Sequence, residues 1–468
     1  FNRLIALRYM EVHDYLPARI RVLSSETPGK IDPDILTEYR HADFPERVVS
    51  EVSALLEQND REGAYRKLLV AQCNELHTIM PFLFEQVTDY TELLLPDSLL
   101  HADSLINKLV FELEESNFEE VEVLGWLYQY YMSERKEQVG GLKNNAVKKE
   151  DLPVVTQLFT PKWIVEYMVQ NSLGKLYDEW KPENELASKW EYYLKSSEPL
   201  PVPNVTKLED IKFIDPACGS GHILVYAFDV LYDMYAEAGY RERDIPQLIL
   251  ENNLFGIDID KRAMQLASFA LMMKGQQKNR RFLRRADELK LNILEFVDSE
   301  EISEEAVSFL NDYVEDISVV EEVTVLFENA KQFGSLLVPK QTAGYYQQYI
   351  EVMESFDLEK ADLINEAHIY ELQEKLLPLL KQAHILATKY EVVVMNPPYH
   401  NKYNPMLKKF MDKNYKEYKS DLYSAFIYRG SQMIKENGFE GMMSPFTWMF
   451  ISSHTKLREY LIDNHSIT

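Results

Sequence analysis

The chain has 468 residues, of which 46% are hydrophobic and 12% aromatic, so it can bury a large core and is not a disordered protein. No stretch approaches the roughly 20 uninterrupted apolar residues of a membrane span, so we expect no membrane partner. The net charge is −26, from 76 acidic and 50 basic residues, which excludes a simple basic coat for nucleic acid but allows one local basic groove.

The cysteine and histidine content indicates the compartment and argues against a metal site. The chain has two cysteines, Cys73 and Cys218, and such low usage is typical of a reducing compartment, so we expect a cytoplasmic protein. Neither cysteine has a partner at metal-ligand spacing, and the ten histidines form no close cluster. We therefore predict no metal.

Residues 1–150 are expected to form a helical N-terminal domain. The stretches "LIALRYMEVHDYL" and "RKLLVAQCNELHTIMPFLFE" carry apolar residues at intervals of three and four, which indicates amphipathic helices. A further long helix is predicted over "EEVEVLGWLYQYYMSERKEQV", ending near Gly140 and Gly141.

From residue 151 to 468 the pattern is that of an α/β domain. A helix is expected to begin at "TPKWIVEYMV", with Thr160 as its N-cap and Pro161 at its first position. Apolar runs then alternate with helices, which predicts a doubly wound, mostly parallel, Rossmann-like sheet. The predicted strands are Lys212–Asp215, Leu254–Asp258, Leu291–Leu294, Glu391–Met395 and Gly441–Ser444.

The interval between the third and fourth predicted strands is too long for a loop. It carries acidic amphipathic stretches such as "SEEAVSFLNDYVEDI", so we predict a helical insertion over about 298–388. Its acidic face is expected to be solvated surface, with a docking surface as the alternative.

The stretch "FIDPACGSGHILVYAFDVL" predicts a ligand-binding turn between a strand and a helix. Gly219 and Gly221 can adopt positive φ, which lets the backbone approach a nucleotide phosphate or a nucleoside. No lysine follows Gly221 as a Walker loop requires, and the third glycine of a dinucleotide fingerprint is missing. The pattern Asp-x-x-Cys-Gly-Ser-Gly instead resembles motif I of S-adenosylmethionine-dependent methyltransferases. Asp258, at the end of the next predicted strand, is the acid expected to accept the ribose hydroxyls.

The second motif, "VVVMNPPYHN", places Asn396, Pro397, Pro398 and Tyr399 after another predicted strand. The Asn396 side-chain oxygen and the Pro397 carbonyl can each accept one N–H of a conjugated amine. Its lone pair is then directed at the sulfonium methyl of the donor. The prolines stiffen the loop, and Tyr399 offers a π-face to a base or a planar amide. This motif is shared by methyltransferases acting on adenine N6, cytosine N4 and protein glutamine.

The order of these motifs resembles the gamma class of adenine-N6 DNA methyltransferases. With "FNRLIALRYMEVHDYLP", "LGWLYQYYMSERKEQV", "TQLFTPKWIVEYMVQNSLG" and "DLYSAFIYRG", the whole chain resembles the PglX-type adenine-specific DNA methyltransferases of BREX phage-defence systems. The resemblance implies catalysis at Asn396–Tyr399 on an adenine flipped out of double-stranded DNA. It implies S-adenosylmethionine contacts by Thr160, Pro161, Asp215, Ala217, Cys218, Gly219, Gly221, Asp258, Ile259, Asn292, Ile293, Tyr423 and Phe426.

The resemblance also implies what surrounds the catalytic domain. Members of this family carry a target-recognition region after that domain, and we expect it to be absent here because the chain stops at Thr468. Lys402, Lys408 and Lys409, just past the second motif, are candidate phosphate contacts. Other BREX proteins and phage-encoded inhibitors are expected partners. The alternatives are a non-catalytic scaffold that binds the cofactor and docks other proteins, and a protein-glutamine methyltransferase.

Overall fold

The computed structural model describes residues 2–86, 95–96, 98–138, 151–152, 154, 160–358, 361 and 363–467. Residues 156–159 of the "TQLFT" stretch and the predicted end of the N-terminal domain near residue 150 lie outside these ranges. The chain divides into two compact units, Phe1–Tyr128 with Gln265–Lys290, and Gln129–Met264 with Leu291–Thr468.

The first unit is built from helices. They are α1 (Asn2–Val12), α2 (Ile35–Glu38), α3 (Glu46–Glu57), α4 (Arg61–His77), α6 (Leu105–Phe111), the start of α7 (Val123–Gln138) and most of α13 (Lys261–Lys278). The buried Glu11 carboxylate orders the loop after α1, since it accepts hydrogen bonds from the Val22 and Leu23 amides at 2.9 and 2.8 Å. Arg8 donates to the same carboxylate at 2.7 Å.

Helix α13 explains why this unit includes residues that we predicted to lie in the α/β domain. In α1, Tyr9 packs edge-on against Phe269 of α13, with ring centroids 6.1 Å apart. Gln265 donates to the Phe82 carbonyl at 2.8 Å. Residues 265–290 therefore contribute to the core of the helical unit, although they follow a strand of the sheet in sequence.

The second unit contains a five-stranded parallel sheet in the order β3-β2-β1-β4-β5, so the predicted α/β fold is confirmed. The strands are β1 (Phe213–Asp215), β2 (Leu254–Asp258), β3 (Asn292–Glu295), β4 (Tyr390–Met395) and β5 (Ile434–Met442). From β1 the order runs to β2 and β3 on one side and to β4 and β5 on the other. The switch in strand order, where open parallel sheets bind ligands, therefore lies between β1 and β4.

Helices cover both faces of the sheet. The first part of the unit supplies α9 (Lys162–Val169), α10 (Lys175–Trp180), α11 (His222–Glu237) and α12 (Ile245–Leu248). Leu224 of α11 packs on Gly256 of β2, where an added Cβ would lie 2.8 Å from the leucine Cδ1. The last part of the unit supplies α20 (Pro405–Asn414), α21 (Leu422–Met433) and α22 (Thr455–Asn464).

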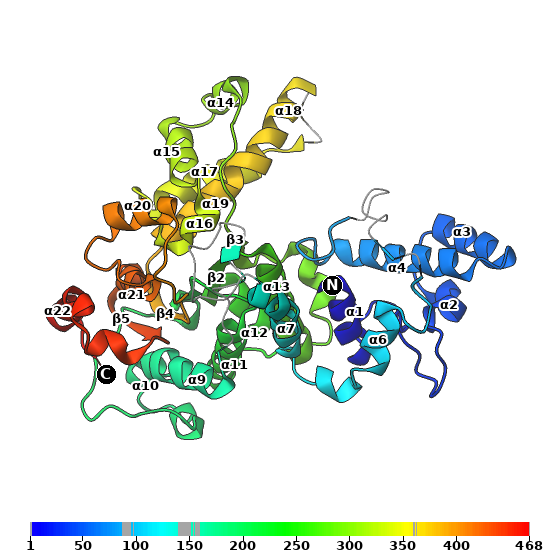
Figure 1. Ribbon diagram of the computed structural model, residues 1–468, viewed down its shortest axis with the longest axis horizontal. Helices are drawn as coiled ribbons and strands as arrows, with labels where there is room; N and C mark the ends of the chain where they lie inside the picture. Colours follow the sequence, from blue (N-terminus) through cyan, green and yellow to red (C-terminus); the bar gives the residue numbers. More distant parts are fainter. Residues whose placement is uncertain are drawn as a thin grey trace. The chain divides into compact units, whose positions relative to one another are not determined.

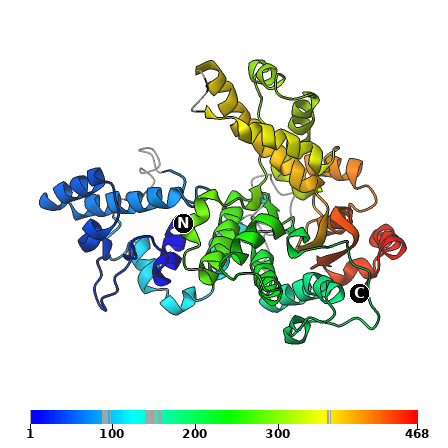
Figure 2. The ribbon, with the colours of Figure 1, turned by 180° about the vertical axis from the view of Figure 1, so that it is seen from behind.

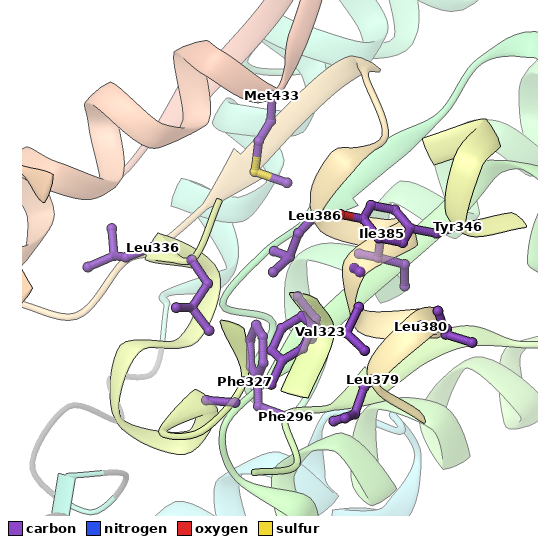
Figure 3. Packing of buried hydrophobic residues seen from close by; sticks show 14 of the residues in the cluster. Phe296, Val323, Phe327, Leu336, Tyr346, Leu379, Leu380, Ile385, Leu386 and Met433 are labelled. Carbon is purple, nitrogen blue, oxygen red and sulfur yellow. The ribbon is translucent and has the colours of Figure 1, made fainter. Parts of the chain in front are cut away.

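The interval between β3 and β4 is filled with helices. They are α14 (Glu304–Leu310), α15 (Ser318–Leu326), α16 (Ala330–Phe333), η10 (Gly334–Leu336), α17 (Ala343–Ser355), α18 (Leu363–Glu371) and α19 (Leu377–Ala387), and the longer ones form a group that extends away from the strands (Figures 1 and 2). Val323, Leu379 and Leu386 of these helices and Phe327, which follows α15, lie in one buried cluster (Figure 3). Ile214 of β1 belongs to the same cluster. The insertion therefore builds the core over one face of the sheet.

Strand β5 differs from its prediction as Gly441–Ser444, because it begins earlier. Ile434 pairs with Tyr390, whereas Phe439 pairs with Val392, so the polar residues between them bulge out of the ladder. Asn437 takes a φ of 61°, and a Cβ at Gly438 would lie 2.9 Å from the Glu391 carbonyl. Polar and glycine residues are typical of turns, and they hid most of this strand in the sequence.

Candidate functional site

The glycine loop leaves the carboxyl end of β1 and turns into α11. Gly219 and Gly221 take φ values of 51° and 86°, the left-handed region that favours glycine. The turn is closed by a hydrogen bond from the Gly221 amide to the Cys218 carbonyl at 2.8 Å. A Cβ added at Gly219 would meet nothing within 4 Å, so the backbone of the loop is open on that side.

Two carboxyl groups, the buried Asp215 and the half-buried Asp258, support this loop from the ends of β1 and β2. Asp258 Oδ2 accepts a hydrogen bond from the Gly219 amide at 2.8 Å, and its Oδ1 accepts one from the Asp260 amide at 2.9 Å. Asp215 accepts a hydrogen bond from the Ala217 amide at 3.1 Å. Burial raises the pKa of Asp258 to about 6 and that of Asp215 well above its usual range.

The Asn396–Tyr399 segment follows Met395, the last residue of β4. Because β4 is parallel to β1 and adjacent to it, with Ile214 paired to Val393, both loops leave the same edge of the sheet from neighbouring strands. The prediction that the two motifs meet at neighbouring strand ends is confirmed. This position is also the switch in strand order.

Hydrogen bonds hold the Asn396 amide at both ends. Its Nδ2 donates to Thr160 Oγ1 at 3.0 Å, and its Oδ1 accepts from the Tyr399 hydroxyl at 2.8 Å. The Tyr399 hydroxyl also lies 3.0 Å from the Met443 carbonyl. Burial raises the pKa of Tyr399 to about 12, so it keeps its proton and remains a donor.

Thr160 does not have the local role that we predicted for it. Helix α9 begins at Lys162, and Pro161 occupies the N-cap position with no side-chain cap. The Thr160 hydroxyl, which is buried, instead contacts the target motif through Asn396. No sequence pattern indicates this pairing, because the two residues are separated by more than 230 positions.

The segment after the target motif is fixed to α21. Asp421, the N-cap of this helix, accepts a hydrogen bond from the His400 amide at 2.9 Å, a contact that we did not predict. Tyr423 packs edge-on against Tyr399 with ring centroids 5.9 Å apart, and its hydroxyl lies 3.0 Å from His454 Nε2. Phe426 is buried in the core of the sheet.

The remaining predicted residues lie further from these two loops. Asn292 stands at the beginning of β3, and its side chain donates to the Leu250 and Glu251 carbonyls at 3.3 and 3.0 Å. This places it at the opposite end of the strand from the glycine loop, so the geometry argues against the predicted cofactor contact. Ile293 is buried, with its Cδ1 3.1 Å from the Cβ position of Gly256. The strand begins one residue later than predicted, and its carboxyl end is Glu295.

The candidate phosphate contacts lie beyond the target motif. Lys408 and Lys409 are exposed on α20, and Lys402 is exposed in the loop before it. In the ranges that the structure describes, no group of three or more His, Cys, Asp or Glu side chains could hold a metal ion. The described helices also include none that is long and apolar enough to cross a membrane.

Comparison with known proteins identifies similar sequences over the whole chain. Residues 252–468 match the family model of the Eco57I restriction-modification methylase. The chain is 41% identical to the adenine-specific methyltransferase BrxX of Escherichia coli O9:H4 (strain HS), over 99% of this chain and 41% of that protein. It is 37% identical to the adenine-specific methyltransferase PglX of Lacticaseibacillus casei (strain Zhang), over 98% of this chain and 40% of that protein.

These matches confirm the resemblance that the motifs predicted. The chain spans about two fifths of the length of the curated relatives that it matches. Among solved structures, one DrdV–DNA complex matches with a TM-score of 0.41 and 12% identity, over 98% of this chain and 37% of that one, a superposition too loose to carry an argument.

Proposed function

We propose that this chain, as part of a PglX-type adenine-specific DNA methyltransferase, transfers a methyl group from S-adenosylmethionine to adenine N6. The observation that carries the proposal is the position of the glycine loop and the Asn-Pro-Pro-Tyr motif on adjacent parallel strands at the switch in strand order. The methylase family match and the adenine-specific relatives support the reaction and the base. The biological role is to mark the cell's own DNA in BREX phage defence.

The residues at the end of β1 and β2 fit the nucleoside and amino-acid parts of this cofactor. The open side of Gly219 leaves room for a ligand against the backbone, and the Asp258 carboxylate can accept ribose hydroxyls. Ile259, partly exposed after the strand, offers an apolar contact to an adenine ring. When bound, the cofactor supplies an activated methyl on a positively charged sulfur.

The target motif is suited to hold an exocyclic amine in line with that methyl. Asn396 Oδ1 has two lone pairs, so the hydrogen bond from Tyr399 leaves one for an N–H of the substrate. The Pro397 carbonyl can accept the second N–H. Because Thr160 and Tyr399 fix the amide at both ends, its acceptor is oriented before the base arrives. The Tyr399 ring offers a stacking face for the flipped adenine.

The proposed DNA contact lies beside this motif. Lys402, Lys408 and Lys409 would meet the phosphates that flank the flipped nucleotide. Reading of the DNA sequence would fall to parts of the full-length protein outside this chain. We place the reaction in the cytoplasm, in keeping with the free, buried thiols of Cys73 and Cys218.

The decisive experiment uses the full-length protein with methyl-labelled S-adenosylmethionine, unmodified duplex DNA and a protein mixture. We expect label in N6-methyladenine, and we expect Asn396→Ala to lose transfer by about 100-fold or more while cofactor affinity stays within about twofold. Wild-type transfer by Asn396→Ala would contradict the mechanism. Label in protein glutamine would favour a protein-glutamine methyltransferase. Cofactor binding with no transfer at all would favour a non-catalytic scaffold.

A further inference from the structure

The Gly334–Leu336 turn, η10, belongs to the helical insertion but packs at the carboxyl edge of the sheet. Gly334 takes a φ of 53°, and a Cβ there would lie 3.3 Å from Cγ2 of Ile259. The buried Ser335 donates its hydroxyl to the Pro216 carbonyl at 2.5 Å. Pro216 and Ile259 directly follow Asp215 and Asp258, the last residues of β1 and β2. The turn therefore touches the first residue of both ligand-facing loops.

The turn is held from its other side by α20 and α21. Arg429 is buried, and its guanidinium donates to the Ser335 carbonyl at 3.1 Å and to the Leu386 carbonyl at 2.8 Å. Tyr415, which directly follows α20, donates its hydroxyl to the Leu336 carbonyl at 2.6 Å. Because these donors bond to backbone oxygens of the turn, they fix its main chain and not only its side chains.

The residues just before the turn are attached to the helix that follows the target motif. Gln332 donates to Asn404 Oδ1 at 2.6 Å, and Asn404 is the N-cap of α20. Phe333 stacks on Phe410 of α20, with ring centroids 4.1 Å apart and an interplanar angle of 10°. The turn therefore has a rigid support independent of the glycine loop.

We infer that η10 positions the methyl-donor site by setting where Pro216 and Ile259 stand against the nucleoside of the cofactor. This inference rests on the proposed function. It gives the insertion a role in binding, beyond the solvated surface that its acidic sequence predicts. Because η10 acts through residues on the nucleoside side, its loss should raise the KM for S-adenosylmethionine and leave kcat at saturating cofactor unchanged.

The first test compares two glycine substitutions in the full-length protein. Gly334→Ala adds a methyl against Ile259 at a φ of 53° and a ψ of −140°, a conformation that side chains other than glycine rarely adopt, whereas Gly239→Ala, at a φ of 81° with nothing within 4 Å, controls for a substitution at positive φ. Affinity for S-adenosylhomocysteine is measured by calorimetry. Relative to the wild type, it should be about tenfold weaker in Gly334→Ala and less than twofold weaker in Gly239→Ala. Equal affinities for the two variants would overturn the inference.

The second test removes the hydrogen bond to Pro216 and decides the matter if Gly334→Ala does not fold. Ser335→Ala should weaken S-adenosylhomocysteine binding about fivefold, and Ser335→Thr, which keeps the hydroxyl, should restore it. Unchanged binding in Ser335→Ala, or equal loss in both variants, would overturn the role of this hydroxyl. A wild-type protein that does not bind S-adenosylhomocysteine would contradict the proposed function itself, which is a different result.

Discussion

Asp258 uses one carboxylate both to hold the glycine loop and to face the proposed cofactor. Its oxygens accept hydrogen bonds from the Gly219 and Asp260 amides, and burial raises its pKa to about 6. The group is therefore ionised at neutral pH and protonated at mildly acidic pH. Protonation removes acceptor capacity where ribose hydroxyls would donate.

This protonation leads to a prediction about pH. Because Asp258 must be ionised to accept the hydroxyls, affinity for S-adenosylmethionine should be constant above pH 7. It should fall below pH 6, approaching tenfold per pH unit. Asp258→Asn should bind more weakly and show no such dependence on pH. Titration calorimetry between pH 5 and 8 gives the cofactor affinity of both proteins. If the affinity of both falls in the same way with pH, another group is responsible for the dependence.

For single residues, the sequence allowed prediction of candidate chemical roles but not of the contacts that hold each side chain. Asp258 and Asn396 could be singled out as candidates because each follows an apolar run that is recognisable in the sequence. The bond between Thr160 and Asn396 was not, because it joins distant segments through the fold. Asn292 lies in the first half of β3 in both the predicted and the observed bounds, so its assignment to the cofactor came from the family resemblance and not from the position of the strand.

Among the elements, β5 carries an unusual buried acid. Glu440 lies against α21, where a Cβ on Gly430 would be within 3.2 Å of its carboxyl carbon. Its Oε1 is buried and lacks a hydrogen-bond partner within the described ranges. Burial raises the pKa of Glu440 well above its usual value of 4.5, so ionisation of this group opposes folding.

The acid of β5 predicts a pH-dependent stability. Since the folded-state pKa is raised, the carboxyl stabilises the fold fully below pH 4.5, and that contribution is lost as the pH rises through the folded-state pKa. The unfolding free energy of Glu440→Gln minus that of the wild type should therefore be larger at pH 8 than at pH 5. Glu436→Gln, exposed on the same strand, is the control. Denaturation curves that shift equally for both variants would contradict this account.

Helix α20 predicts a salt-dependent DNA affinity. If Lys408 and Lys409 each neutralise a phosphate, replacing both with Ala should lower the slope of log affinity against log salt by about 2. The same change at Lys340 and Lys381, in the insertion, should leave the slope unaltered. The measurement is DNA binding by the full-length protein over a range of salt concentrations, and identical slopes for the two double variants would exclude α20 from the DNA contact.

The strands were predictable to different degrees. Four strands were found within about a residue of their bounds because buried parallel strands form continuous apolar runs. Most of β5 was missed because its bulge consists of turn-forming residues. The helices of the insertion were predicted from their periodicity, but the contact of η10 with Pro216 was not, since Ser335 and Pro216 are separated by 119 positions.

For the whole molecule, composition and motif order predicted the fold class but not how the chain divides. The helical unit takes residues 265–290 from the middle of the α/β sequence, because α13 packs its aromatic and polar side chains with α1 and the loop after α4. The sequence pattern of α13 does not indicate which unit it belongs to, because it is that of an ordinary amphipathic helix after a strand. The acidic net charge likewise says nothing of the local lysines on α20.

In the proposed function, the loops after β1 and β4 bring a methyl donor and a target amine together at the switch in strand order. The most direct measurement is a structure of the full-length protein bound to S-adenosylhomocysteine and duplex DNA. We expect the cofactor sulfur over Gly219–Gly221 and a flipped adenine with N6 at Asn396, about 5 Å apart, which is the ~3–3.5 Å approach of the reacting atoms plus the length of the missing carbon–sulfur bond. A cofactor bound elsewhere, or an adenine that does not reach Asn396, would contradict it.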